Sequence, residues 1–180
     1  LAECCRKYDV TLAGGGIAQA PEGVFAADLL MIGEPGTKIL TRAGAKIGDV
    51  IYVTGDLGGS ILGKHLNFTP RLAEGQWLAE QSAVRGVIDV TDGLAKDLPE
   101  ILPVDADALL DISALPISKA ARKLSKHDGH SALFHALTDG EDYELLFAVN
   151  GQTNLAAFEK RWHKAHATPL TRIGKIVTAL

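Results

Sequence analysis

Strand-like and helix-like patterns alternate along most of this sequence, and that alternation limits its fold more than any other feature. Apolar residues recur with period two from Tyr143 to Val149, which is the pattern of a half-buried strand. The stretch 154–165 shows the wider spacing of an amphipathic helix. Elements that alternate in this way pack as a sheet with helices on its faces. The sequence therefore predicts an α+β fold, a mixed β-sheet covered by helices.

Gly, Pro and apolar patterns predict the remaining elements and one domain boundary. Further strands are expected at 11–15, 24–34, 49–55 and 108–112, and further helices at 36–45, 60–66, 94–102 and 118–126. Pro35 and Gly36 end the second of these strands. We therefore divide the chain into a segment 1–36, the last part of one domain, and a second domain 37–180.

Composition and charge narrow the class of function. The 180 residues are 47% hydrophobic with a formal net charge of -4, so a core can form while no basic surface favours nucleic acid. The two cysteines, Cys4 and Cys5, are adjacent and poorly placed for a disulfide, which suits a reducing cytoplasm. The apolar stretch 24–32 is interrupted by Asp28 and is too short for a membrane span. We expect a soluble protein that acts on small molecules.

A first acidic stretch, VIDVTDGLAKDL at 87–98, stands where an aliphatic strand gives way to a helix. Its strand ends on Asp89, Thr91 and Asp92, and Gly93 allows a ligand to approach the backbone closely. Ligands of α/β proteins commonly sit at such strand ends. Mg²⁺ prefers carboxylates, waters and substrate phosphates as ligands. The stretch therefore favours a metal and phosphate site.

A second acidic stretch, TDGEDYE at 138–144, holds four acids and no basic residue. The acids are Asp139, Glu141, Asp142 and Glu144. Like charges this dense repel one another unless water, a cation or a pKa shift relieves them. A bound divalent ion would provide that relief, so this stretch also favours a metal site.

Simpler interpretations stay open for single residues. Asp92 would serve as the cap of the helix that starts near Leu94, and the pair Asp139-Gly140 would make a hairpin turn. Neither accounts for Asp89 at the end of an apolar run, nor for the three acids that follow the turn. Taken together, the acids favour the metal site.

Two other motifs are interpreted as structural. GGSILGKH at 58–65 nearly matches a phosphate loop, but His65 stands where the magnesium-binding hydroxyl is needed, which favours a sharp strand-to-helix turn. Two histidine pairs, at 127 and 130 and at 163 and 166, have the spacing of zinc ligands. Because no cysteine or third ligand accompanies either pair, solvent-exposed histidines are expected.

Four stretches together resemble a known family. LTRAGAKIGDVIYVTG, TPRLAEG, GVIDVTDGLAKDL and TDGEDYELLF, in this order, resemble thiamine-monophosphate kinases, which belong to the aminoimidazole ribonucleotide synthetase-related superfamily. The resemblance implies a two-domain, homodimeric enzyme that uses ATP and Mg²⁺ to convert thiamine monophosphate to thiamine diphosphate. It also implies that residues 1–36 are the last part of an N-terminal ATP-binding domain and that 37–180 are the C-terminal domain of that superfamily.

The resemblance implies roles for individual residues. By this carry-over Asp89 and Asp92 hold magnesium, Thr91, Arg42 and Gly15 bind ATP, and Glu141 faces the thiamine part of the substrate. No catalytic side chain is expected, because the acceptor phosphate is already anionic near neutral pH and needs no general base. The work of the protein would be to hold two polyanions in line and screen their charge.

One departure from the family pattern matters. The family carries a G-G-D-T motif whose aspartate binds magnesium, and Gly16 stands at that position here. The isolated chain is accordingly expected to have little activity. Two alternatives stay open: a related ATP-dependent synthetase with another acceptor, and a catalytically dead relative that binds nucleotide.

Overall fold

The computed structural model describes residues 1–34, 36 and 38–179, which form two compact units, 1–34 and 35–180. Pro35 and Thr37, on which the predicted domain boundary falls, lie outside the described residues, as does Leu180. The assignment of the units to particular domains stays a prediction.

The first unit contains one helix, α1 (Ala2–Lys7), and no strand among residues 1–34. The strands predicted at 11–15 and 24–34 are therefore wrong. A strand is defined by hydrogen bonds to a neighbouring strand, and these segments have no such partner in the described part of the chain. Their apolar side chains remain exposed, as Phe25 and Leu30 illustrate.

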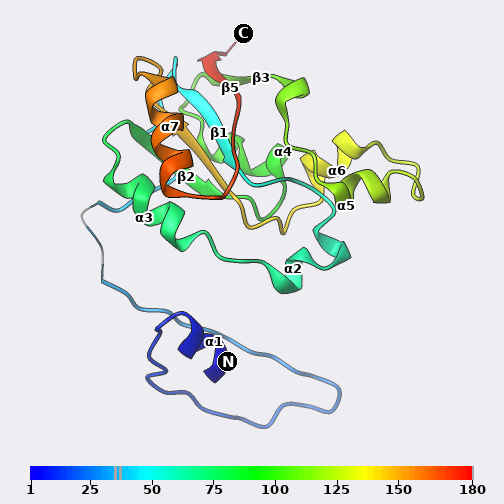
Figure 1. Cartoon of the computed structure of the whole chain (residues 1–180). Helices are drawn as coiled ribbons and strands as arrows, with labels where there is room; N and C mark the ends of the chain where they lie inside the picture. Colours follow the sequence, from blue (N-terminus) through cyan, green and yellow to red (C-terminus); the bar gives the residue numbers. More distant parts are fainter. Residues whose placement is uncertain (35, 37, 180) are drawn as a thin grey trace. The chain divides into compact units, whose positions relative to one another are not determined.

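The second unit is built on a five-stranded sheet with the order β2-β4-β1-β5-β3 (Figure 1). The strands are β1 (Val50–Thr54), β2 (Val84–Asp89), β3 (Ala106–Leu110), β4 (Leu145–Val149) and β5 (Leu170–Thr178). All four strand pairs are antiparallel, and one isolated parallel bridge joins Leu57 to Ile117. The predicted α+β class is confirmed. The prediction that the sheet is mixed is wrong, because all its strand pairs are antiparallel and the parallel bridge lies outside the named strands.

The helices of the second unit pack on the two faces of this sheet or lie in the segments that connect its strands. They are η1 (Ser60–Leu62), α2 (Lys64–Asn67), α3 (Leu72–Glu80), α4 (Leu94–Asp97), η2 (Pro99–Ile101), η3 (Ile112–Ala114), α5 (Lys119–Leu124), α6 (Ala132–Thr138) and α7 (Leu155–Ala165). On one face Leu78 of α3 and Trp162 of α7 pack on Phe147 of β4, and on the other Leu94 of α4 packs on Leu146. Within the described residues no helix has the length and hydrophobicity needed to cross a bilayer.

The segment after the first unit differs from its prediction. A helix is predicted at 36–45, yet residues 38–45 are irregular. They run along the outer edge of β2, where the Thr41 carbonyl accepts the Val87 N–H at 2.9 Å and the Lys38 Nζ donates to the Val84 carbonyl at 2.8 Å. These contacts with the sheet edge outweigh the local helix propensity.

Candidate functional site

The two acidic stretches, far apart in sequence, lie side by side in the structure. We call residues 89–93, which begin at the last residue of β2, the first acidic loop. Residues 139–144, which directly precede β4, are the second acidic loop. Three backbone hydrogen bonds join the two loops: Glu141 N–H to the Thr91 carbonyl at 2.7 Å, Tyr143 N–H to the Val90 carbonyl at 2.9 Å, and Val90 N–H to the Glu144 carbonyl at 2.8 Å.

Glycines permit this close approach. Gly140 has a φ of 70°, and a Cβ there would come 2.4 Å from the Thr91 carbonyl oxygen. Gly93 has a φ of 101°, and a Cβ there would come 2.9 Å from the Leu137 carbonyl oxygen. Both positions therefore require glycine for conformation and for space.

In the first acidic loop the carboxylates of Asp89 and Asp92 are exposed. Neither has a hydrogen bond or ion pair to any side chain that the structure describes. The helix-cap interpretation of Asp92 is wrong, because Gly93 occupies the N-cap position of α4 and makes no side-chain cap. The buried carboxylate of Asp97 reaches back instead, and its Oδ2 accepts the N–H groups of Thr91 at 2.8 Å and Asp92 at 3.0 Å.

The donor set of this loop fits magnesium bound together with a nucleotide. Within residues 1–34, 36 and 38–179 no three His, Cys, Asp or Glu side chains form a metal-binding group. Magnesium, however, is commonly held by one or two carboxylates, with waters and substrate phosphates as the other ligands. Asp89 and Asp92 offer two carboxylates that have no partner among the described side chains. Thr91, which lies between them in the sequence, is half-buried. Their metal-binding and phosphate-binding roles stay predictions.

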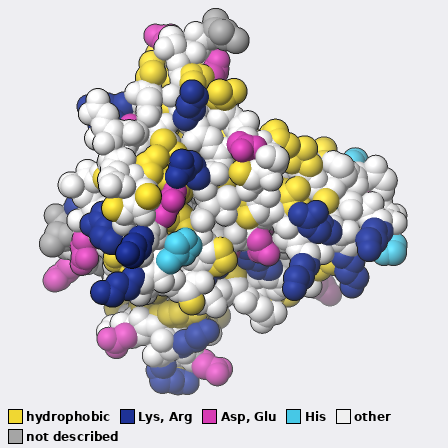
Figure 2. Space-filling model, turned by 45° about the horizontal axis from the view of Figure 1, so that its top comes forward, with side chains coloured by type: hydrophobic (Ala, Val, Ile, Leu, Met, Phe, Trp, Pro, Cys, Tyr) yellow, Lys and Arg dark blue, Asp and Glu magenta, His cyan; other side chains and the backbone are white. Residues whose placement is uncertain are grey.

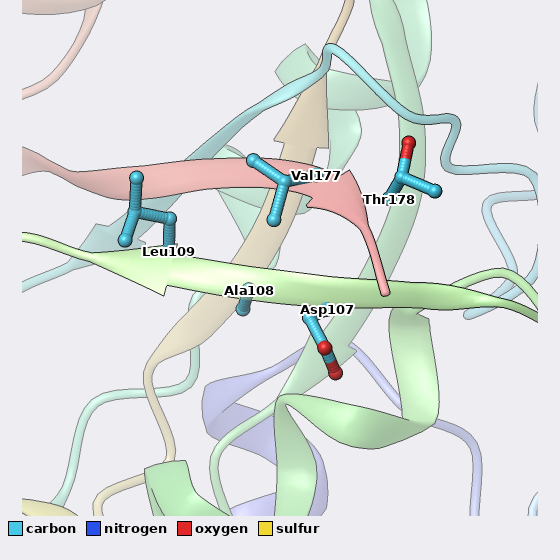
Figure 3. A pocket seen from close by; sticks show the side chains of 5 residues that line it. All are labelled: Asp107, Ala108, Leu109, Val177 and Thr178. Carbon is cyan, nitrogen blue, oxygen red and sulfur yellow. The ribbon is translucent and has the colours of Figure 1, made fainter. Parts of the chain in front are cut away.

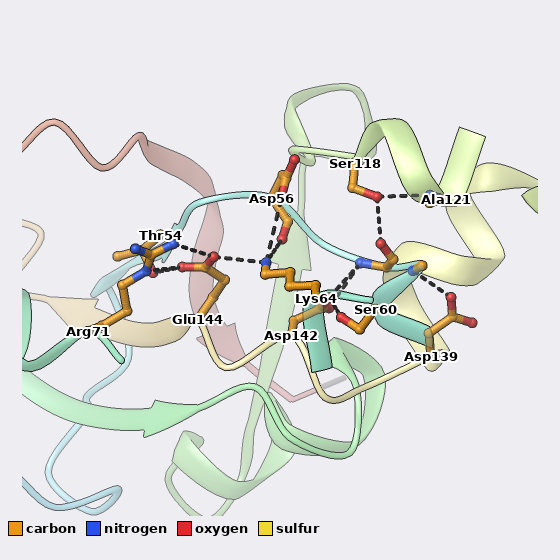
Figure 4. Close-up of polar contacts among 12 residues, drawn as sticks. Thr54, Asp56, Ser60, Lys64, Arg71, Ser118, Ala121, Asp139, Asp142 and Glu144 are labelled. Carbon is orange, nitrogen blue, oxygen red and sulfur yellow. Dashed lines mark hydrogen bonds and ion pairs between the residues drawn. The ribbon is translucent and has the colours of Figure 1, made fainter. Parts of the chain in front are cut away.

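Most acids of the second acidic loop bond to groups of the protein itself, and the metal prediction for those acids is wrong. Asp142 is buried, and its carboxylate accepts the Gly58 N–H at 2.9 Å and the Ser60 hydroxyl at 2.7 Å (Figure 4). Asp139 accepts the Gly59 N–H at 2.7 Å. The protein itself therefore relieves the charge repulsion that suggested a bound cation.

Glu144 is the most tightly held of these acids. It is 1% exposed, and its carboxylate accepts hydrogen bonds from Thr54 at 2.7 Å, from Lys64 at 2.9 Å and from both Nε and Nη2 of Arg71 at 2.7 and 2.8 Å. Figure 4 shows these groups converging on it from three separate segments. Gly55 makes room, since a Cβ there would lie 2.1 Å from the carboxylate.

The two buried acids of this loop have pKa values shifted in opposite directions. Burial raises the pKa of Asp142, and its hydrogen bonds only partly offset that effect. Burial alone would also raise the pKa of Glu144, but the hydrogen bond from Arg71 and the charge of Lys64 outweigh it, so that pKa is lowered. Glu144 is therefore held as a carboxylate.

The motif at 58–65 is a sharp turn, as predicted. The Gly58 and Gly59 N–H groups, which a phosphate would need, donate to the carboxylates of Asp142 and Asp139. Lys64 of the same motif pairs with Glu144. Sequence reasoning missed Lys64 and Arg71 as partners of the second acidic loop. The available signal was the requirement that an acid in an apolar strand pattern, such as Glu144, find a base.

Glu141 is the exception among the acids of the second acidic loop. It is exposed, has a φ of 51°, and borders a shallow hollow. The hollow is lined by Ile61, Leu124, Asp128, His135, Asp139, Gly140 and Glu141. The structure thus brings Glu141 against the first acidic loop and leaves its carboxylate accessible.

The two other predicted site residues are not joined to this pair of loops by the described contacts. Arg42 is exposed and pairs with Glu100 at 2.8 Å. Because exposed ion pairs are weak, Arg42 remains available to an anion. Gly15 lies in the first unit, where it is exposed. The ATP-binding roles of Arg42 and Gly15 stay predictions.

Other surface features lie apart from the predicted site residues. A second hollow runs along β3 and β5 and is lined by Asp107, Ala108, Leu109, Val177 and Thr178 (Figure 3). On the face seen in Figure 2, basic and acidic side chains are interspersed. Three of the four predicted surface histidines are exposed, whereas His166 is half-buried against Trp77 and Trp162.

Comparison with known proteins gives the family resemblance independent support. No family model matches the chain. A thiamine-monophosphate kinase of Rhodopirellula baltica is 36% identical over 178 residues, covering 98% of this chain and 54% of that protein. The crystal structure of the thiamine-monophosphate kinase from Stenotrophomonas maltophilia superposes with a TM-score of 0.66 at 31% identity, over 79% of this chain and 52% of that chain.

A further structural neighbour is AaThiL, solved in complex with AMPPCP and TMP. It has a TM-score of 0.64 at 23% identity and covers 79% of this chain and 49% of that chain, so it supports the fold alone. The chain spans about half the length of the curated relatives it matches.

These comparisons show the class of fold: the second unit has the α+β fold found in kinases that act on a phosphorylated small molecule. Its particular resemblance, predicted from four sequence stretches, is to the thiamine-monophosphate kinases, and that resemblance is confirmed.

Proposed function

We propose that this chain forms part of an enzyme that uses ATP and magnesium to phosphorylate thiamine monophosphate to thiamine diphosphate. The observation that carries the proposal is the contact between the two acidic loops, where the Glu141 N–H donates to the Thr91 carbonyl at 2.7 Å. It sets the predicted nucleotide and metal residues beside the residue predicted to face the acceptor. The relatives named thiamine-monophosphate kinase support the same substrate.

The residue types agree with this chemistry. In the transfer, an anionic oxygen of the acceptor phosphate attacks the γ-phosphorus of ATP, and ADP leaves. Magnesium, when bound, would neutralise charge on the phosphates, and Asp89 and Asp92 would hold it. Thr91 and Arg42 would contact the nucleotide phosphates. The exposed carboxylate of Glu141 would attract the positively charged thiazolium of the acceptor.

The direct test is turnover of thiamine monophosphate by the protein in its full natural length, with ATP and Mg²⁺, followed as thiamine diphosphate formed. We expect product that depends on both ATP and the metal. A folded protein that forms no thiamine diphosphate would refute the substrate assignment. A panel of other acceptors, with release of phosphate as the readout, would then test the related-synthetase alternative.

The alternative of a dead relative rests on Gly16 in place of the family aspartate. Gly16 is exposed, and a Cβ there would meet no atom within 4 Å, so Gly16→Asp fits the structure. If residue 16 belongs to the metal site, Gly16→Asp should lower the Mg²⁺ concentration at which turnover is half-maximal. If wild type binds Mg²⁺-AMPPCP in calorimetry but neither it nor Gly16→Asp turns over, the binding-only alternative is favoured.

The remaining predictions belong to the same proposal. We infer that the isolated chain has little activity, because it spans about half of its relatives and carries Gly16. A homodimer and a cytoplasmic location are expected from the resemblance and from the adjacent cysteines. Light scattering after size-exclusion chromatography tests the first of these two expectations.

A further inference from the structure

The first acidic loop has an anchor of its own. A single oxygen, Oδ2 of buried Asp97, accepts the N–H groups of Thr91 and Asp92, at 2.8 and 3.0 Å. Asp97 is 6% exposed and follows this loop on α4. Among the described contacts, its carboxylate bonds to no residue of the second acidic loop. It therefore sets the backbone of the loop whose side chains are predicted to bind metal and nucleotide.

The second acidic loop has a separate and stronger anchor, and it needs one. Glu141 and Tyr143 both have a φ of 51°, which is unfavourable for residues with a Cβ and persists only where surrounding contacts enforce it. Two sets of contacts hold this backbone. The Glu141 and Tyr143 N–H groups donate to the Thr91 and Val90 carbonyls at 2.7 and 2.9 Å. The buried carboxylate of Glu144 accepts hydrogen bonds from two nitrogens of Arg71 and from Thr54 and Lys64. The side-chain partners of Glu144 all lie outside the first acidic loop.

Side chains in the second acidic loop alternate between inward and outward positions. Asp142 and Glu144 are buried, whereas Glu141 is exposed and Tyr143 is half-buried, stacked on Phe68 with ring centroids 4.1 Å apart. The inward acids are thus locked to the protein while the outward Glu141 faces solvent. Loss of the lock is therefore expected to move Glu141, whose carboxylate has no partner among the described side chains.

We propose that Asp97 and the Arg71–Glu144 pair are positioning residues with separate effects, Asp97 on nucleotide and metal binding and Arg71–Glu144 on binding of the acceptor. This inference rests on the proposed function, since it assumes that the first acidic loop binds Mg²⁺-ATP and that Glu141 contacts thiamine monophosphate. Neither positioning residue touches a reacting atom. Each acts through the backbone of the loop it holds.

The test is a crossed kinetic comparison in the protein at its full natural length. Arg71→Ala should raise the KM for thiamine monophosphate by about tenfold or more and change the KM for Mg²⁺-ATP by less than about twofold. Asp97→Ala should do the reverse and should also lower kcat. Kinetics are measured at a temperature at which circular dichroism shows each variant to be folded.

Conservative variants guard against general damage. Arg71→Lys keeps the charge but loses the two-nitrogen grip, so it should restore only part of the acceptor KM. Asp97→Asn should restore much of the nucleotide KM, because one oxygen suffices for both N–H groups. The matched control is Arg172→Ala, which removes an arginine that pairs with Glu159 at 2.7 Å on α7 and should leave both KM values unchanged.

The outcomes separate the two ideas. If wild type fails to phosphorylate thiamine monophosphate, the proposed function fails, and calorimetry of Mg²⁺-AMPPCP binding then tests the inference, which expects weaker binding for Asp97→Ala and not for Arg71→Ala. If wild type is active but both variants raise both KM values equally, or alter only thermal stability, the separate-effects inference is overturned.

Discussion

The two acidic loops have similar composition, but their carboxylates differ in burial and in hydrogen bonding. In the first, Asp89 and Asp92 are exposed, and the described contacts leave their carboxylates free. In the second, Asp142 and Glu144 are buried and bonded to groups of the protein itself. The comparison teaches that a dense run of acids indicates a ligand site only where the fold leaves those acids without internal partners.

The reason for the difference lies in what each loop packs against. The second acidic loop lies against the turn after β1, which offers the N–H groups of Gly58 and Gly59, and near Lys64 and Arg71. The first acidic loop leaves the sheet at the end of β2, and Asp97 satisfies its N–H groups without using its side chains. One loop is therefore stabilised by its acids, and the other presents them.

The largest expected effect concerns the stability supplied by Glu144. Glu144→Leu leaves Arg71 and Lys64 without their buried partner, and breaking such a pair costs about 3–5 kcal/mol. Urea unfolding measures this loss. The control is Glu100→Leu, whose ion pair with Arg42 is exposed and should cost at most about 1 kcal/mol. Equal losses in the two variants would contradict the distinction between a locked and an ordinary acid.

Asp92→Asn should affect activity and spare stability. We expect turnover of thiamine monophosphate to fall by about a hundredfold or more, which corresponds to about 3 kcal/mol of transition-state stabilisation. The melting temperature should stay unchanged, because the carboxylate of Asp92 is exposed and has no partner among the described residues, while its backbone N–H keeps its bond to Asp97. Asp107→Asn, an exposed acid on β3, is the control. A fall of less than about threefold would remove Asp92 from the site.

Gly140→Ala tests the contact between the loops. Its φ of 70° and the 2.4 Å approach to the Thr91 carbonyl make a Cβ unfavourable, and we expect a loss of about 1–3 kcal/mol in the free energy of unfolding. Gly129→Ala is matched in φ, at 82°, but has no atom within 4 Å of the added Cβ. If both variants lose the same stability, backbone conformation and not the contact is responsible.

The smallest effect is a pH dependence at the edge of the second acidic loop. Hydrogen bonding to Asp139 raises the pKa of buried His135, with Asp128 and His130 also nearby. Its stabilising contribution is therefore complete below the unfolded pKa of about 6.5 and is lost as pH rises through the higher folded pKa. The stability advantage of wild type over His135→Gln should shrink from pH 5.5 to 9 in urea unfolding; growth with pH would contradict it.

Much of the second unit could be predicted from the sequence. Period-two patterns predicted β4 and helical spacing predicted α7. The helix predicted at 118–126 is α5, which Ser118 caps by accepting the Ala121 N–H at 2.8 Å. Segments whose state depends on distant partners could not be predicted. Residues 38–45 pair with the edge of β2, and the stretches 11–15 and 24–34 have no strand to pair with in the described chain.

The candidate site, too, could be predicted only where it does not depend on distant partners. That the first acidic loop presents free carboxylates followed from its place at a strand end. That Asp142 and Glu144 are locked did not, because their partners Ser60, Lys64 and Arg71 lie far away in sequence and only folding brings them together. The local sequence pattern identified the acids, and long-range packing determines which of them bond within the protein.

Metal titration tests the contrast between the loops most directly. Mn²⁺ is titrated into the protein at its full natural length in the presence of AMPPCP, and free Mn²⁺ is followed by electron paramagnetic resonance. We predict that Asp89→Asn and Asp92→Asn each weaken Mn²⁺ binding by about tenfold or more, while Asp139→Asn, whose carboxylate bonds to the Gly59 N–H, leaves it within about twofold. Unchanged binding in the first two variants, or loss of binding in the third, would contradict the account.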